Sequence, residues 1–141
     1  MRYYEAESRI AAAPDAVWWV LTDASGWSSW DSGVDGVDGR IAPGEKVTIR
    51  SKAAPGRAFP VTVSEFDPPG RLRLRGGMPL GLFRGVRTYR LVPQPDGGTV
   101  FQMREEYTGA LLPMIWRTMP DLGPSFTQFA EGLKHRVESG G

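Results

Sequence analysis

The last stretch of the chain, Asp121–Ser139, has the clearest periodic pattern of apolar positions. Its apolar residues recur at steps of four, three, four and four, as Leu122, Phe126, Phe129, Leu133 and Val137. This spacing is typical of a helix with one apolar stripe. A stripe of this size has to be buried against a broad surface, and the pattern favours a β-sheet as that surface.

Six other stretches alternate apolar and polar residues, which predicts strands. They are Arg2–Ile10, Lys46–Lys52, Ala58–Phe66, Arg71–Arg75, Leu82–Val92 and Thr99–Thr108. A further short strand is indicated between Asp31 and Gly44. Two short helices are expected after the first strand, one opened by Pro14 and one that carries Trp27 and Trp30. The order predicts a single α+β domain over residues 1–141, with an antiparallel sheet of about six or seven strands and one long C-terminal helix.

Two segments between these elements are rich in glycine or proline. Gly76–Gly81 lacks the Lys-Ser/Thr of a phosphate loop, so we expect a flexible hairpin at the rim of a cavity. Ala110–Pro120 is apolar and interrupted by Pro113 and Pro120. We expect it to be a broken approach to the last helix that gates this cavity, with ordinary core packing as the alternative.

Composition excludes several classes of function. The formal net charge of +1 over 141 residues argues against binding driven by nucleic-acid phosphates. Without cysteine there are no disulfides, thiolate metal sites or cysteine nucleophiles. The longest apolar run, Ala16–Leu21, is far shorter than the ~20 residues of a membrane span. The N-terminus does not resemble a secretory signal, so a cytoplasmic protein without a membrane span is expected.

Four stretches, in this order, carry a resemblance that spans nearly the whole chain: AAAPDAVWWVLTDASGWSSWD, VSEFDPPGRLRLRG, TYRLVPQPDGGTVFQMREEYTG and FTQFAEGLKHRVES. The chain resembles the START-like or Bet v 1-like (SRPBCC) superfamily, and within it the polyketide cyclase/dehydrase-like group. The resemblance implies a helix-grip fold, in which a curved sheet wraps the C-terminal helix around a deep cavity. Superfamily members bind lipids, sterols and polyketides, and some catalyse cyclisation, dehydration or hydrolysis. A fold shared this widely does not settle the function.

The two strands joined by the Asp96-Gly97 turn hold the strongest candidate chemistry. Antiparallel pairing about this turn brings Arg87 opposite Met103 to Glu105. If these faces look inward, Arg87 and Glu105 are buried together, and each then requires the other. One interpretation is a structural ion pair or a pair that faces solvent. The other is a polar anchor on the floor of a ligand cavity, with Arg87, Tyr89 and Glu105 as the weak catalytic candidates.

The predicted ligand-binding residues combine this anchor with apolar positions that the pattern and the resemblance place at the cavity. They are Trp30, Phe59, Phe83, Arg87, Tyr89, Met103, Glu105, Met119, Leu122 and Phe126. Within the last helix, Leu122 and Phe126 are predicted to form the cavity wall and the part from Phe129 to Val137 to form permanent core. No cofactor is expected. The acidic residues Asp31, Asp35 and Asp38 lack the spacing of a calcium loop, and the single histidine, His135, is predicted on the solvent side.

Three hypotheses of function follow from these observations. The first is binding of an apolar or amphipathic small molecule, of lipid, polyketide or aromatic type, by a monomer or homodimer. The second is a cyclase or dehydratase that acts on a polyketide-like substrate. The third is an interaction module similar to the activators of the Hsp90 ATPase, which have the same architecture.

Overall fold

The computed structural model of this chain describes residues 1–140. Its elements, in chain order, are β1 (Arg2–Ile10), α1 (Pro14–Thr22), the 3-10 helix η1 (Ala24–Ser29), β2 (Val34–Asp38), β3 (Lys46–Ser51), β4 (Phe59–Asp67), β5 (Arg71–Gly77), the 3-10 turn η2 (Pro79–Gly81), β6 (Arg84–Pro93), β7 (Thr99–Thr108), α2 (Leu112–Thr118) and α3 (Gly123–Glu138). This order confirms the predicted α+β fold with two short helices after the first strand and a long C-terminal helix.

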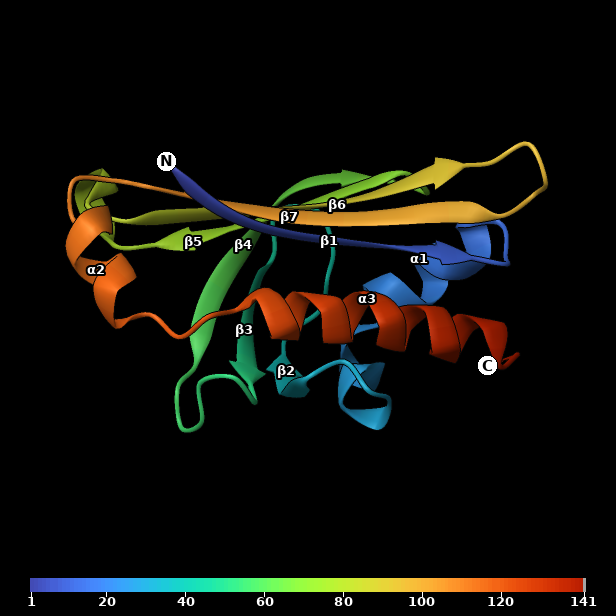
Figure 1. Ribbon diagram of the computed structural model, residues 1–141, viewed down its shortest axis with the longest axis horizontal. Coiled ribbons are helices and arrows are strands. Elements are labelled where there is room, and N and C mark those ends of the chain that lie inside the picture. The colour runs from blue at the N-terminus through green and yellow to red at the C-terminus, as the bar shows by residue number, and fades with distance from the viewer. Residues whose placement is uncertain (141) are drawn as a thin grey trace.

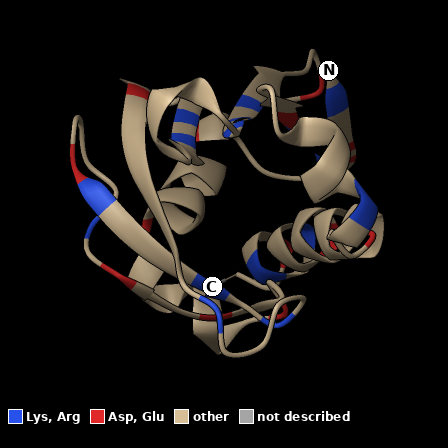
Figure 2. Ribbon diagram, turned by 90° about the vertical axis from the view of Figure 1, so that its left-hand side faces the viewer, with Lys and Arg blue, Asp and Glu red and all other residues tan. Residues whose placement is uncertain are grey.

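The seven strands form one antiparallel sheet in the order β1-β7-β6-β5-β4-β3-β2. The sheet curls around α3, which lies along its concave side (Figures 1 and 2). Register shifts interrupt the pairing in β2 between Val34 and Gly36 and in β4 between Val63 and Glu65. Because an extra residue in one strand bends and twists a sheet, these bulges account for part of the curl.

The predicted apolar stripe of the last helix is the centre of the core. Phe126, Phe129 and Leu133 are buried, whereas Leu122 and Val137 are half-buried at its two ends. The side chain of Trp27 is also buried, and its indole Nε1 donates to the carbonyl of Leu21 over 3.0 Å. The short helices therefore pack against one end of the sheet through a buried tryptophan whose indole N–H has a hydrogen-bond partner, as expected for core packing.

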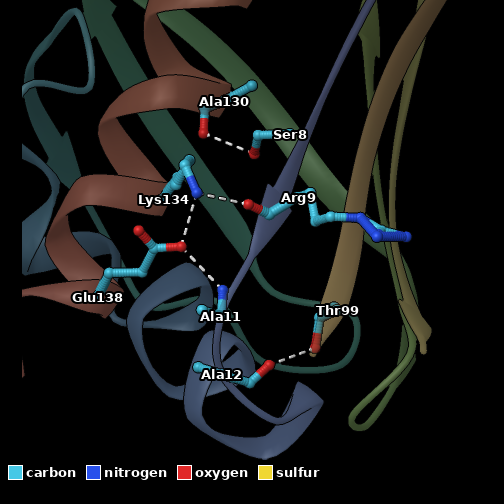
Figure 3. Close-up of polar contacts among 8 residues, drawn as sticks. All are labelled: Ser8, Arg9, Ala11, Ala12, Thr99, Ala130, Lys134 and Glu138. Carbon is cyan, nitrogen blue, oxygen red and sulfur yellow. Dashed lines mark hydrogen bonds and ion pairs between the residues drawn. The ribbon is translucent and has the colours of Figure 1, made fainter. Parts of the chain in front are cut away.

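Three polar contacts fasten the C-terminal half of α3 to the end of β1 (Figure 3). The buried hydroxyl of Ser8 donates to the Ala130 carbonyl over 2.8 Å. The Lys134 ammonium donates to the Arg9 carbonyl over 2.7 Å, and the Ala11 amide donates to the Glu138 carboxylate over 2.8 Å. Lys134 and Glu138 also pair with each other, one helical turn apart, so these groups fix the helix at this end of the sheet.

The contacts of Glu138 predict a dependence of stability on pH. Its hydrogen bonds from Lys134 and from the Ala11 amide lower the pKa of this carboxyl. A carboxyl whose folded pKa is lowered stabilises the fold above its ordinary pKa of about 4.3, and this stabilisation is lost as the pH falls through the folded value. Urea unfolding should therefore show Glu138→Gln to be less stable than the unsubstituted protein near neutral pH and equally stable in acid.

Glu131→Gln is the control on the same helix, because Glu131 is exposed and makes no ion pair among residues 1–140. Its difference in stability from the unsubstituted protein should not shrink as the pH falls. A difference at Glu138 that stays constant with pH would contradict the assignment.

Two segments differ from their predictions. Residues 110–120 were expected to be a broken approach, but most of them form the helix α2, with Pro113 in its first turn. A proline is harmless there, because the first amides of a helix have no intrahelical partner. The glycine-rich segment after β5 joins β5 to β6 as the predicted hairpin, but it also contains the short 3-10 turn η2. Within residues 1–140, none of the helices combines the length and the apolar character that crossing a membrane requires.

Candidate ligand-binding site

A cavity of about 430 Å³ lies between the concave face of the sheet and the N-terminal half of α3. Residues of β3 to β7 form its floor, and α2, the segment that joins α2 to α3, and the first turns of α3 form its wall. Exposed residues at the ends of these elements also line it, among them Arg57, Phe59 and Pro120, and so mark its mouth. A volume of this size lies within the usual range of small-molecule sites, about 300 to 1,000 Å³.

The β6–β7 hairpin supplies the polar part of the floor. Its register places Arg87 opposite Glu105 and Tyr89 opposite Met103, which confirms the predicted juxtaposition. Because side chains alternate along a strand, Gly85 and Tyr107 form the next cross-strand pair on the same face. Gly85 leaves room for the carboxylate, since a Cβ there would lie 2.5 Å from Oε2 of Glu105.

Arg87 and Glu105 form an ion pair on this floor. The Arg87 Nε donates to Oε1 of Glu105 over 2.5 Å, and the guanidinium carbon lies 4.7 Å from the ring centroid of Phe126. The two side chains are 26% and 16% exposed, and both line the cavity. Burial by itself lowers the pKa of Arg87, but the Glu105 carboxylate and the neighbouring tyrosines outweigh it and the pKa is raised. Arg87 therefore stays charged at the bottom of a largely apolar cavity.

Two buried phenol hydroxyls lie beside this pair. The buried hydroxyls of Tyr89 and Tyr107 have no geometrically defined hydrogen-bond partner among residues 1–140. Both lie close enough to Arg87 for its positive charge to act on their pKa values. Burial raises the pKa of both phenols, and the nearby Arg87 opposes this only in part. Both hydroxyls are therefore protonated at neutral pH, and Tyr107, which lines the cavity, can donate a hydrogen bond into it.

Most of the residues that the sequence predicts for the site are brought together at the cavity. Its lining includes eight of them, namely Phe59, Phe83, Arg87, Met103, Glu105, Met119, Leu122 and Phe126. Tyr89 and Trp30 are not part of the lining. The Tyr89 ring is fully buried against Phe101 and Phe129, and Trp30 packs against Phe129 at 5.3 Å between ring centroids. The role of the eight residues in binding stays a prediction.

The lining also contains residues that the predicted set omits. Tyr107 shares its strand face with Glu105, so the alternation of β7 already indicated it. Phe129 belongs to the part of the helix predicted as permanent core, yet it lines the cavity as well as the core. Ser51 and Ser125 add hydroxyls from β3 and from the start of α3, and no sequence pattern singled them out.

The other candidate groups lie away from the cavity. His135 is exposed on α3, as predicted. Asp31 accepts a hydrogen bond from Nε2 of Gln128 over 2.7 Å, and Asp38 pairs with Arg50. Within residues 1–140 no three histidine or acidic side chains gather as metal ligands would. The polar chemistry of the cavity therefore rests on Arg87, Glu105, Tyr107 and the serine hydroxyls.

Comparison with known proteins connects this geometry to a family. Residues 1–138 match the family described as polyketide cyclase / dehydrase and lipid transport. The chain belongs to this family. Its membership confirms the resemblance to the SRPBCC superfamily that the sequence suggested. A search of the curated proteins found no significant match.

Several solved structures have the same helix-grip fold. A protein from Mesorhizobium loti is 21% identical with a TM-score of 0.76, and the match covers 98% of each chain. The Zhui aromatase/cyclase of Streptomyces sp. R1128 is 17% identical with a TM-score of 0.74, over 97% of this chain and 93% of that one. A START superfamily protein of Mycobacterium smegmatis is 15% identical with a TM-score of 0.71, over 99% of both. At these identities the similarity concerns the fold alone.

Proposed function

We propose that this protein binds an apolar or amphipathic small molecule, of lipid, polyketide or aromatic type, in the cavity between the sheet and α3. The observation that carries the proposal is the cavity itself, which is lined mainly by apolar side chains around a few convergent polar groups. This combination is the usual composition of a small-molecule site, in which apolar contacts supply affinity and the polar groups fix the orientation.

The polar groups favour a ligand with an oxygen atom at one end. The Arg87 Nε donates to Glu105, and the same guanidinium carries Nη donors that can reach an acceptor in the cavity. The Tyr107 hydroxyl adds a neutral donor on the same strand face. A carboxylate, carbonyl or phenol oxygen would accept from both residues, while the apolar body of the ligand lies against Phe59, Leu122 and Phe126.

A panel of fluorescent fatty acids and polyphenols, together with native mass spectrometry, tests the proposal. We expect a complex of one ligand per chain with at least one probe. Ser125→Trp places a large ring in the cavity from the first turn of α3, and it should weaken binding about tenfold, which corresponds to about 1.4 kcal/mol. Thr127→Trp, on an exposed position of the same helix, is the matched control and should bind as the unsubstituted protein does. The proposal would be contradicted if no probe in the panel bound, or if both variants changed the affinity equally.

A second candidate function is a cyclase or dehydratase reaction, favoured by the protonated Tyr107 beside the Glu105 carboxylate. Glu105 would act as the general base and Tyr107 as the general acid or oxyanion donor on a polyketide-like substrate. Turnover by the purified protein that is lost in Glu105→Gln, under conditions in which circular dichroism shows the variant to be folded, would support catalysis. Turnover that survives Glu105→Gln would exclude this assignment of the base.

A further inference from the structure

Exposed apolar side chains gather at the end of the molecule that carries α2. Leu80 is 95% exposed, Met114 is 60% exposed and Met78 is 44% exposed. Leu80 is also the only residue other than glycine, within residues 1–140, with a positive φ, at +62°. A leucine in this left-handed conformation is strained, because its Cβ crowds the following carbonyl oxygen. Neither its exposure nor its backbone stabilises the fold, so the stability of the chain does not explain a leucine here.

The two segments that carry these side chains are tied together. The amide of Leu111, just before α2, donates to the Leu82 carbonyl over 2.9 Å, and the amide of Met78 donates to the Phe83 carbonyl over 2.8 Å. Figure 1 shows the turn between β5 and β6 beside α2 at one end of the molecule. Met78, Leu80 and Met114 are therefore exposed apolar side chains on neighbouring segments at one end of the molecule, and this group is called the apolar tip below.

Three arginines surround the apolar tip. Arg84 pairs with Gly77 at the base of the turn, and Arg117 lies three residues after Met114, on the same side of α2. The Arg2 guanidinium lies 5.4 Å from the ring centroid of Trp116 in α2. None of the three makes an ion pair within residues 1–140. Figure 2 views the molecule from this end, with the positions of lysine and arginine in blue.

From this arrangement we infer that the apolar tip docks on the surface of an anionic phospholipid bilayer. Met78, Leu80 and Met114 enter the boundary between headgroups and acyl chains, and Arg2, Arg84 and Arg117 contact the phosphates. Buried apolar area and basic charge both strengthen binding of this kind, and each basic residue near an anionic surface contributes about fivefold to the partition coefficient. A protein partner is less favoured, because the exposed side chains of the tip are flexible and aliphatic and include none of the aromatic anchors of a protein interface.

Docking in this orientation also places the cavity next to the bilayer. Gly77 and Phe83, which flank the turn, line the cavity, and so does Ile115, the neighbour of Met114 in α2. An apolar ligand could pass between the bilayer and the cavity along this edge with little exposure to water. The docking itself does not depend on the ligand, so the two proposals fail or succeed separately.

Co-sedimentation with lipid vesicles tests the inference. We expect binding to vesicles of phosphatidylcholine mixed with phosphatidylglycerol and weaker binding to phosphatidylcholine alone. Leu80→Asn removes the apolar side chain at a position where asparagine tolerates the backbone, so it should lower the partition coefficient about tenfold while the protein remains as stable or becomes more stable. Arg84→Gln and Arg117→Gln should each lower it about fivefold on the mixed vesicles only.

Two variants outside the apolar tip serve as controls. Trp19→Ser removes an apolar side chain that is 77% exposed on α1, at the other end of the molecule in Figure 1, and Arg40→Gln removes an exposed arginine. Neither should change the partition coefficient. No binding to the mixed vesicles, or binding that Leu80→Asn leaves intact, would overturn the inference. Binding to polyglutamate without binding to vesicles would assign the arginines to an acidic protein and would also overturn it.

Discussion

Replacing Gly132 by alanine is expected to lower the free energy of unfolding by about 3 kcal/mol, the upper range for overpacking a core. The same change in the interior of an ordinary helix raises stability by about 1 kcal/mol. The sign of the effect reverses here because the backbone of α3 at Gly132 lies in close contact with residues 30 and 31, just before β2. A Cβ on Gly132 would overlap the Asp31 carbonyl oxygen and lie 3.3 Å from Cε3 of Trp30. Asp31 contributes a backbone atom, which cannot rotate away as a side chain can.

Urea unfolding followed by circular dichroism measures this effect. Thr127→Ala, at an exposed position of the same helix, is the matched control and should be neutral or slightly stabilising. If Gly132→Ala proved as stable as the unsubstituted protein, the close approach of α3 to residue 31 would be contradicted, and with it the position of the helix over the sheet.

The second large effect is expected at Arg87. Arg87→Met keeps an unbranched apolar stem but removes the charged donors that line the cavity. Hydrogen bonds to charged groups contribute about 1.5–3 kcal/mol, so affinity for a medium-chain fatty acid should fall about tenfold to a hundredfold. The alcohol of the same chain length should lose much less. The variant should also be about 3 kcal/mol less stable, because it leaves the Glu105 carboxylate without its cation.

Isothermal titration calorimetry measures the affinity of each variant for the fatty acid and for the alcohol of the same chain length. A loss confined to the acid reports the contact between its carboxylate and Arg87, and a loss for both reports weaker binding of the apolar chain. Arg57→Met is the control, since Arg57 lines the same cavity but is exposed at its mouth, where water screens its charge. Arg87→Lys keeps the charge while it loses the planar fork, so it should retain the fold and an intermediate affinity for the acid. An equal loss for acid and alcohol would show that Arg87 supports the fold and not the orientation of a ligand.

The contact between Arg87 and Glu105 could be predicted because its causes are local. The turn at Asp96-Gly97 fixes the register of the hairpin, and the alternation of apolar residues fixes which face is buried. The apolar stripe of α3 was equally clear, since it depends only on helical spacing. These two patterns together determine the sheet, the helix and the floor of the cavity between them.

The remaining features depend on how far the sheet curls, which no short pattern encodes. Trp30 was expected at the cavity because of its place in the resemblance, but it packs behind Phe129, where Gly132 leaves room for it. The helix α2 was missed because Pro113 indicates a break unless it falls in a first turn, where it is tolerated. The glycines at 85 and 132 have ordinary local surroundings in the sequence, and their close contacts come from distant segments.

A crystal structure of the protein with the medium-chain fatty acid tests the central claim most directly. The account predicts one fatty acid in the cavity, with its carboxylate within hydrogen-bond distance of the Arg87 guanidinium and the Tyr107 hydroxyl and its chain against Leu122 and Phe126. A fatty acid bound elsewhere, or one bound in the cavity with its carboxylate turned away from Arg87, would contradict it.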